Sequence, residues 1–219
     1  MRYNSYSTWI RQQFPFRVQK IAVDAGFSCP NRDGHISTGG CIFCDNRTFN
    51  PSYCNPEKSI TTQLEEGKQF FSHKYPDMKY LAYFQAYSNT YADIDTLKRR
   101  YEEALDVENV VGLVIGTRPD CIDATTLNYL ELLNQQTFLI VEYGIESANN
   151  TTLQLINRGH TFETSCQAIK ATHDRDILTG GHVILGLPGE DATESMRQAD
   201  LISALPRDLL KIHQLQINK

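Results

Sequence analysis

The stretch VVGLVIGTRPDCIDATTLNYLELLNQQTFLIVEY, residues 110–143, decides the fold class. Val110–Ile115 and Phe138–Tyr143 are short apolar runs rich in β-branched and aromatic residues, as in buried strands. Between them, residues 123–134 carry apolar side chains at helical spacing and begin with Asp123, a residue type that favours the N-cap. A strand, a helix and a second strand in this order predict one unit of a parallel β/α fold.

The same alternation continues on both sides of this unit. We expect further strands at 20–23, 79–84, 179–185 and 210–217, and helices at 62–71, 93–105, 149–157, 162–173 and 191–201. T-Q-L-E at residue 62 and D-A-T-E at residue 191 are capping-box patterns that predict helix starts. Six strands separated by helices predict an α/β fold with one parallel sheet. Periodicity alone does not choose between an open sheet and a partial barrel.

Composition narrows the class of protein. The 219 residues suffice for one sizeable domain, and the net charge of −5 excludes a global basic field that would attract nucleic acid or anionic lipid. No apolar run approaches the ~18 residues of a membrane span, and the first residues lack the apolar segment of a signal peptide. We therefore expect a cytoplasmic protein with no membrane partner and with reduced cysteines.

Three of the six cysteines lie in a glycine-rich loop after the first expected strand. Cys29, Cys41 and Cys44 have the spacing C-x11-C-x2-C. Cysteine thiolates hold both zinc and iron–sulfur clusters. With Cys54 as a fourth ligand the set could close around a structural zinc, whereas three cysteines alone would leave one iron of a cluster open. The spacing leaves both interpretations open.

Polar or glycine-rich segments follow the expected strands. They are QAYSNTY (85–91), GTRPDC (116–121), EYGIES (142–147) and GLPGE (186–190). Because ligand sites of parallel α/β folds lie at the carboxyl ends of the strands, these segments predict one shared site.

The segments DAGFSCPNRDG (24–34), GGCIFC (39–44), GTRPD (116–120), INRGH (156–160) and GLPGE (186–190) together resemble the radical S-adenosylmethionine (SAM) superfamily. More narrowly, they look like the YhcC/YtqA-type proteins, relatives of the elongator catalytic subunit and of the oxygen-independent coproporphyrinogen oxidases. The resemblance runs from about residue 17 to the end. It implies a three-quarter β/α barrel of six parallel strands over residues 20–219, preceded by an N-terminal extension over 1–19. We also expect a C-terminal part that this chain lacks.

The resemblance implies an enzyme with two cofactors. Cys29, Cys41 and Cys44 would ligate three irons of a 4Fe–4S cluster, and SAM would occupy the fourth iron. The reduced cluster would cleave SAM to a 5′-deoxyadenosyl radical that abstracts hydrogen from a substrate. Contacts to SAM are implied for Phe43, Gln85, Ser88, Glu142, Glu146, Arg158, His182 and Gly186.

Within that set, Phe43 and Gly186 would face the adenine, and Gln85 and Ser88 the methionyl amine. Glu142 and Glu146 would meet the ribose or the methionine, and Arg158 the SAM carboxylate. His182 stands where the coproporphyrinogen oxidases carry an aspartate that contacts the ribose. Tyr87, Tyr91 and Arg118 are candidates for substrate contacts.

Ordinary structural roles compete with these assignments. His182 is flanked by apolar residues and could be a core histidine, and Glu142 could be a polar strand end. Arg158 could pair with a helix carboxylate, and Arg118 with Asp120 could form a turn around Pro119.

The substrate is the least determined feature. Kinship to the elongator subunit implies a modified base of transfer RNA, and kinship to the coproporphyrinogen oxidases implies a tetrapyrrole. The expected reductant is a flavodoxin or a ferredoxin. The alternative from a different class is a non-catalytic binding module whose loop is stabilised by zinc or by a cluster.

Overall fold

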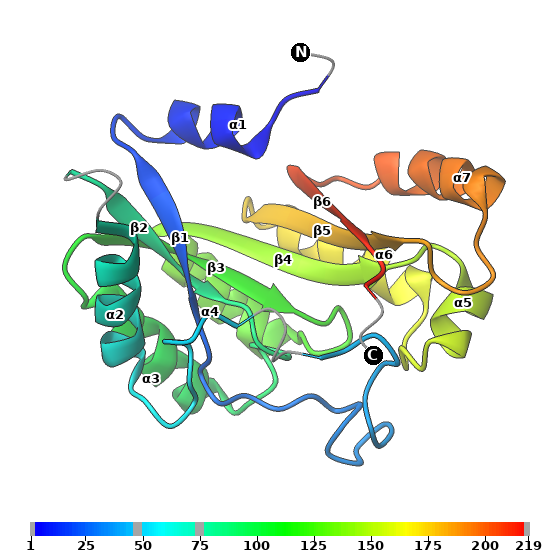
Figure 1. Ribbon diagram of the computed structural model, residues 1–219, viewed down its shortest axis with the longest axis horizontal. Coiled ribbons are helices and arrows are strands. Elements are labelled where there is room, and N and C mark those ends of the chain that lie inside the picture. Colours follow the sequence, from blue (N-terminus) through cyan, green and yellow to red (C-terminus); the bar gives the residue numbers. More distant parts are fainter. Residues whose placement is uncertain (1–2, 46–49, 73–76, 217–219) are drawn as a thin grey trace.

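The structure is a computed structural model that describes residues 3–45, 50–72 and 77–216. Six parallel strands form one sheet in chain order and curl into a partial barrel (Figure 1). They are β1 (Val18–Val23), β2 (Lys79–Phe84), β3 (Val110–Thr117), β4 (Phe138–Glu146), β5 (Leu178–Leu185) and β6 (Leu209–Gln214). The predicted α/β class and the predicted partial barrel of six parallel strands are confirmed. β1 and β6 are the two edges of the sheet, so the barrel is open between them.

Helices connect the successive strands. They are α2 (Ile60–Ser72), α3 (Ile94–Leu105), α4 (Ala124–Asn134), α5 (Asn150–Leu155), α6 (Phe162–His173) and α7 (Ala192–Ser203). Asp93, Asp123 and Asp191 accept backbone N–H groups three residues on, at the starts of α3, α4 and α7. Each carboxylate satisfies a donor that the first helical turn leaves free.

The two faces of the sheet bury different clusters because strand side chains alternate. In β2, Ala82 and Phe84 belong to the large cluster shared with the connecting helices. Leu81 and Tyr83 belong to a smaller cluster on the concave face. Burial on both faces explains why these strands are nearly continuous apolar runs.

A helix that the sequence did not predict, α1 (Tyr6–Gln13), covers part of the concave face. Its Ile10 is buried against Leu81, Tyr83 and neighbouring strand residues, and Trp9 packs on the same cluster. In Figure 1, α1 lies on the opposite side of the sheet from α2 and α3. This helix lies inside the predicted N-terminal extension. It covers the part of the concave face that is nearer to the starts of the strands.

Several predicted boundaries were wrong, among them the end of β4, which lies at Glu146 and not at Tyr143. The helix predicted to begin at Thr62 begins at Ile60, because Ser59 Oγ accepts the Thr62 N–H and thereby acts as the cap. The helix predicted over 149–157 ends at Leu155, and Asn157 has a left-handed backbone with φ 54°. The last strand ends at residue 214, and residue 217 of that prediction lies outside the described residues.

Within residues 3–45, 50–72 and 77–216, no helix is both long and apolar enough to span a membrane.

Candidate active site

A cavity of about 420 Å³ lies on the concave side of the sheet, beyond the part that α1 covers. It receives the loop after β1 and the carboxyl ends of β2 to β6, as expected for a parallel sheet. The structure brings eleven of the fourteen predicted site residues to its wall: Cys29, Cys41, Phe43, Cys44, Gln85, Tyr87, Arg118, Glu142, Glu146, Arg158 and His182.

The cysteine loop folds back on itself through backbone bonds. The Gly40 N–H donates to the Asn31 carbonyl at 2.9 Å, and Asn157 Nδ2 donates to the Gly40 carbonyl at 2.8 Å. Gly40 has φ 82°, and a Cβ there would lie 2.9 Å from Arg32 Nη1, so the return requires glycine. The eleven residues between Cys29 and Cys41 thus form a closed loop that carries both sulfurs to the cavity.

The three thiols are not arranged around a single ion. Among the described residues, no group of three or more His, Cys, Asp or Glu side chains is placed to hold one metal ion. Cys54, the fourth ligand of the zinc interpretation, is buried in the large core cluster and is absent from the cavity wall. Three thiols on one cavity wall fit the cysteine ligands of an iron–sulfur cluster, where each sulfur takes a different iron.

Cationic and amide donors point at two of the three sulfurs. Arg158 Nη1 and Asn31 Nδ2 lie 3.6 and 3.5 Å from Cys41 Sγ, and Arg118 Nη1 lies 4.0 Å from Cys29 Sγ. Donors of this kind stabilise a thiolate, the form that binds a metal. At Cys44, burial and then the nearby Cys41 raise the pKa of the thiol, whereas the charge of Arg32 opposes them.

Arg118 is itself held in place. Its guanidinium forms a two-point ion pair with Asp120 at 2.9 and 2.7 Å, and Nη2 donates to the Arg158 carbonyl at 2.8 Å. The side chain is 3% exposed, so the pair is a buried brace between the end of β3 and the Arg158 segment. The sequence interpretation of Arg118 and Asp120 as a structural turn therefore describes part of its role.

The guanidinium of Arg158 already has protein partners, so it is not a free receptor for a carboxylate. Nη2 donates to the Gly144 carbonyl at 2.6 Å and lies 3.6 Å from Glu146 Oε1. Its Nε is buried with no partner among the described residues. One donor of Arg158 is thus left without a protein partner.

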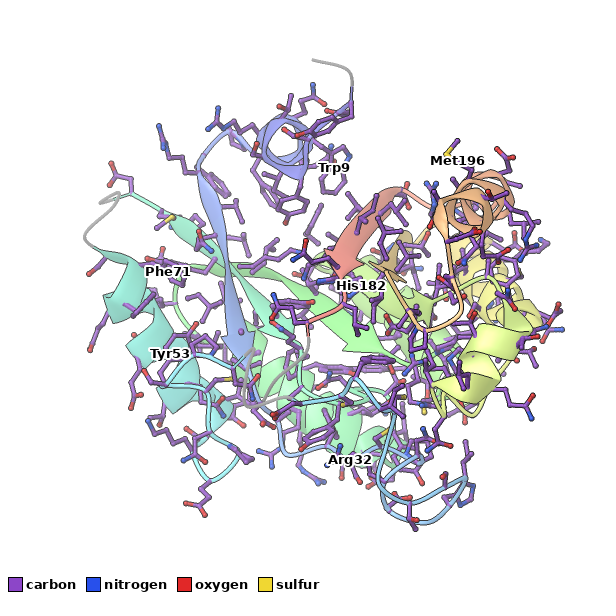
Figure 2. The ribbon with its side chains drawn as sticks, turned by 45° about the vertical axis from the view of Figure 1, so that its right-hand side comes forward. Trp9, Arg32, Tyr53, Phe71, His182 and Met196 are labelled. Atoms are coloured by element: carbon purple, nitrogen blue, oxygen red, sulfur yellow. The ribbon has the colours of Figure 1, made fainter. Side chains whose placement is uncertain are left out.

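Glu142 is surrounded by partners at the centre of the concave face. It is 5% exposed, its Oε1 lies 2.5 Å from Lys20 Nζ, and its Oε2 lies 2.8 Å from His182 Nε2. Burial alone would raise the pKa of Glu142, but the hydrogen bond from His182 and the charge of Lys20 outweigh it and hold the pKa well below its usual range. Both oxygens already have protein partners, so Glu142 is an ion-pair anchor in this structure, and its contact with SAM stays a prediction. Figure 2 shows His182 among the strands and Arg32 in the loop beyond their ends.

Three predicted site residues do not reach the cavity wall. Ser88 is fully buried, and its hydroxyl contacts Thr117 Oγ1 at 3.1 Å and accepts the Arg118 N–H at 3.3 Å. Tyr91 lines a separate hollow, with its ring 6.4 Å from that of His35. Gly186 has φ 85° in the turn after β5 and lies outside the residues that line the cavity. A position just after a strand does not by itself show that a side chain lines the cavity. The conformation of the turn after each strand decides which side chain faces inward.

Several wall residues escaped the sequence analysis. They are Tyr83, Lys211 and His213 on the strands, and Lys20, which is paired with Glu142, escaped it as well. Side chains alternate between the two faces of a strand, and this alternation along β1, β2 and β6 could have identified the four strand residues as inward-facing. The apolar appearance of the strand segments concealed it.

The family model described as "Radical SAM superfamily" matches residues 33–199. The chain belongs to the radical SAM superfamily. This radical SAM chain is 37% identical over 218 residues to "Uncharacterized protein YtqA" of Bacillus subtilis, covering 100% of this chain and 68% of that protein. The predicted resemblance to the YhcC/YtqA type is confirmed.

Two further likenesses are more distant. A tRNA uridine(34) acetyltransferase of Methanocaldococcus jannaschii is 32% identical over 81 residues, which are 37% of this chain and 14% of that protein. The solved structure of Methanocaldococcus infernus Elp3 superposes with a TM-score of 0.66 at 18% identity. It covers 91% of this radical SAM chain, which spans 46% of that one, and at this identity the likeness concerns the fold alone.

Proposed function

We propose that this chain is the core of a radical SAM enzyme in which Cys29, Cys41 and Cys44 hold a 4Fe–4S cluster. The observation that carries the proposal is the set of three thiols on one cavity wall, with donors on two of the sulfurs and Cys54 elsewhere. Three protein ligands leave the fourth iron for SAM. When bound and reduced, the cluster supplies cleavage of SAM to a 5′-deoxyadenosyl radical, which abstracts hydrogen from the substrate.

The chain's own residues would prepare the site for this chemistry. Arg118, Arg158 and Asn31 stabilise negative charge on the sulfurs, and the buried brace between Arg118 and Asp120 keeps that geometry fixed. The guanidinium of Arg158, which lines the cavity, would supply positive charge toward a carboxylate such as that of SAM. Phe43, which packs against the large apolar cluster, helps to keep water from the wall.

We propose a base of transfer RNA as the substrate. The partial similarity to a tRNA uridine(34) acetyltransferase supports this choice. Tyr87 lines the cavity, is 37% exposed, and has the Arg32 guanidinium 5.5 Å from its ring centroid. An exposed aromatic ring beside an arginine is the kind of platform on which proteins stack unpaired RNA bases. A flavodoxin or a ferredoxin is the proposed electron donor.

The first experiment tests the cofactor chemistry. The chain is reconstituted anaerobically with iron and sulfide and examined for a brown colour and for 5′-deoxyadenosine formed from SAM in the presence of dithionite. Cys44→Ala should abolish both, and Cys54→Ala, the matched control outside the cavity, should retain them. A colourless protein that binds one zinc would contradict the proposal.

The second experiment tests the substrate. Binding to bulk tRNA should weaken steeply as salt rises, because phosphate contacts release counterions. Digested tRNA from a strain that lacks the gene should miss one modified nucleoside found in the parent. Binding that is absent at low salt, together with identical nucleoside profiles, would rule out tRNA as the substrate.

A further inference from the structure

A group of inward-facing polar side chains spans the open side of the barrel, and we call it the basic seam: Lys20, Tyr83, Glu142, His182, Lys211 and His213. Lys20 comes from the edge strand β1, and Lys211 and His213 come from the opposite edge strand β6. Lys20 Nζ and Lys211 Nζ lie 4.9 and 5.8 Å from the centroid of the same ring, that of Tyr83. The two lysines of the two edges therefore meet above one tyrosine.

The charges of the basic seam do not cancel. Glu142 is its only carboxylate, and its oxygens are occupied by Lys20 at 2.5 Å and His182 at 2.8 Å. No ion pair to Lys211 exists among the described residues, although the surrounding protein desolvates its ammonium group and lowers its pKa. Burial, followed by the charge of Lys211, lowers the pKa of His213 to about 4, so His213 is neutral near pH 7. Lys211, an exposed residue that lines the cavity, is thus left without an ion-pair partner among the described residues, although Glu142 and Glu146 attract its charge from a greater distance.

An ammonium group that lines a cavity and has no ion-pair partner favours an anionic ligand. An oxyanion would accept the N–H groups of Lys211, for which the described residues provide no ion-pair partner, and such charge-assisted hydrogen bonds are strong. The neighbouring His213 can add a neutral N–H donor, with its ring 5.3 Å from that of His182.

The position of Lys211 separates this anion from a carboxylate near Arg158. In the sheet register, Lys211 aligns with His182, which aligns with Gly144, the carbonyl acceptor of Arg158. Two strand spacings of about 4.8 Å put the backbone of Lys211 roughly 10 Å from that of Gly144. A second acidic group therefore has its own place at the open side of the barrel.

We propose that Lys211 and His213 form an oxyanion subsite in the cavity and that its ligand is the phosphate group of a nucleotide substrate. The subsite rests on the geometry of the basic seam alone. Its assignment to a nucleotide phosphate rests on the proposed function. The same chemistry could also receive the methionyl carboxylate of SAM, and the experiment below distinguishes the two sources.

The test measures binding of three probes to the reconstituted chain by calorimetry and by the histidine ring resonances in NMR spectra. The probes are uridine 5′-monophosphate, uridine, and S-adenosylhomocysteine, which carries the amino-acid carboxylate. Uridine 5′-monophosphate should bind more tightly than uridine and should shift the His213 resonances. Lys211→Met should weaken its binding about tenfold, in line with a charged hydrogen bond, and Lys211→Arg should retain most of it. Lys170→Met, an exposed lysine on α6, is the matched control and should change nothing.

Glu142→Gln provides a test in the opposite direction. Removing the only carboxylate of the basic seam frees Lys20, so uridine 5′-monophosphate should bind about fivefold more tightly. A purely structural role of the seam predicts no gain. Circular dichroism checks that each variant is folded.

Three results would overturn the subsite. They are equal affinities for uridine 5′-monophosphate and uridine, unchanged nucleotide binding in Lys211→Met, and a loss in that variant confined to S-adenosylhomocysteine. Failure of the proposed function would look different, since a chain without a cluster or without SAM cleavage could still show the phosphate-dependent shifts.

Discussion

Glu142→Gln should destabilise the fold by a calculable amount. The carboxylate is 5% exposed and its partner Lys20 is 20% exposed at the side chain, so this ion pair lies inside the protein. Breaking a buried pair by removing one charge costs about 3–5 kcal/mol. Because glutamine can keep one hydrogen bond to His182 and Lys20 retains some solvent, we expect the lower end, about 3 kcal/mol. For a chain of this length that loss lowers Tm by roughly 6–12 °C.

The same variant should have a distinct pH dependence. Because the pKa of Glu142 in the folded state lies well below its usual range, its contribution to stability is complete above about pH 5 and is lost as the pH falls. With an unfolded pKa of about 4.3, the stability gap between wild type and variant should shrink by about 1 kcal/mol at pH 3.5.

Urea unfolding followed by circular dichroism at pH 7.5 and pH 3.5 measures both quantities. Glu65→Gln, which removes a more exposed partner of Lys68 on α2, is the matched control and should cost no more than about 1 kcal/mol at either pH. A loss below about 1 kcal/mol for Glu142→Gln at pH 7.5 would refute the reasoning from the buried pair. A gap that stays constant down to pH 3.5 would refute the reasoning from the pKa.

Three other variants test the core and the loop. Ile10→Ala should destabilise the protein by about 2–4 kcal/mol in urea unfolding, because Ile10 is 6% exposed and anchors α1 on the concave face; an effect below 1 kcal/mol would mean that α1 does not hold there. Gly67→Ala should cost about 1–3 kcal/mol, because a Cβ on α2 would lie 2.3 Å from Ile21 Cγ2; an unchanged Tm would contradict that close approach. Cys41→Ala should lose most of its iron after reconstitution while keeping its far-ultraviolet circular dichroism, and iron content equal to wild type would exclude Cys41 as a ligand.

The sequence predicted most of the sheet because each strand has its own local signal. Runs such as Val110–Ile115 need no partner to be recognised as buried strands, and the helix between two of them fixes their parallel order. The element that the sequence did not predict is stabilised by contacts with residues that are distant along the chain. The helix α1 carries little apolar signal of its own and forms on the surface that Leu81 and Tyr83 provide.

The candidate site divides in a similar way. The cysteine loop was recognisable because its three cysteines lie within one short segment of the sequence. Ser88 and Tyr91 lie away from the cavity wall, because the turn after β2 directs one into the protein and the other to a separate hollow. The basic seam was missed because its members come from five strands and share no local pattern.

The sequence by itself determined the alternation of strands and helices, the parallel order of the sheet and the three cysteines of the loop. These features depend on residues that are close along the chain, where side-chain periodicity and turn chemistry act directly. Only the tertiary structure decided that Cys54 is a core residue and that Arg158 and Arg118 point at sulfurs. It also decided that Glu142 neutralises Lys20 and leaves Lys211 unpaired. The physical reason is that charge and hydrogen bonding act between groups that are neighbours in space, and here the curl of the sheet makes neighbours of residues more than a hundred positions apart.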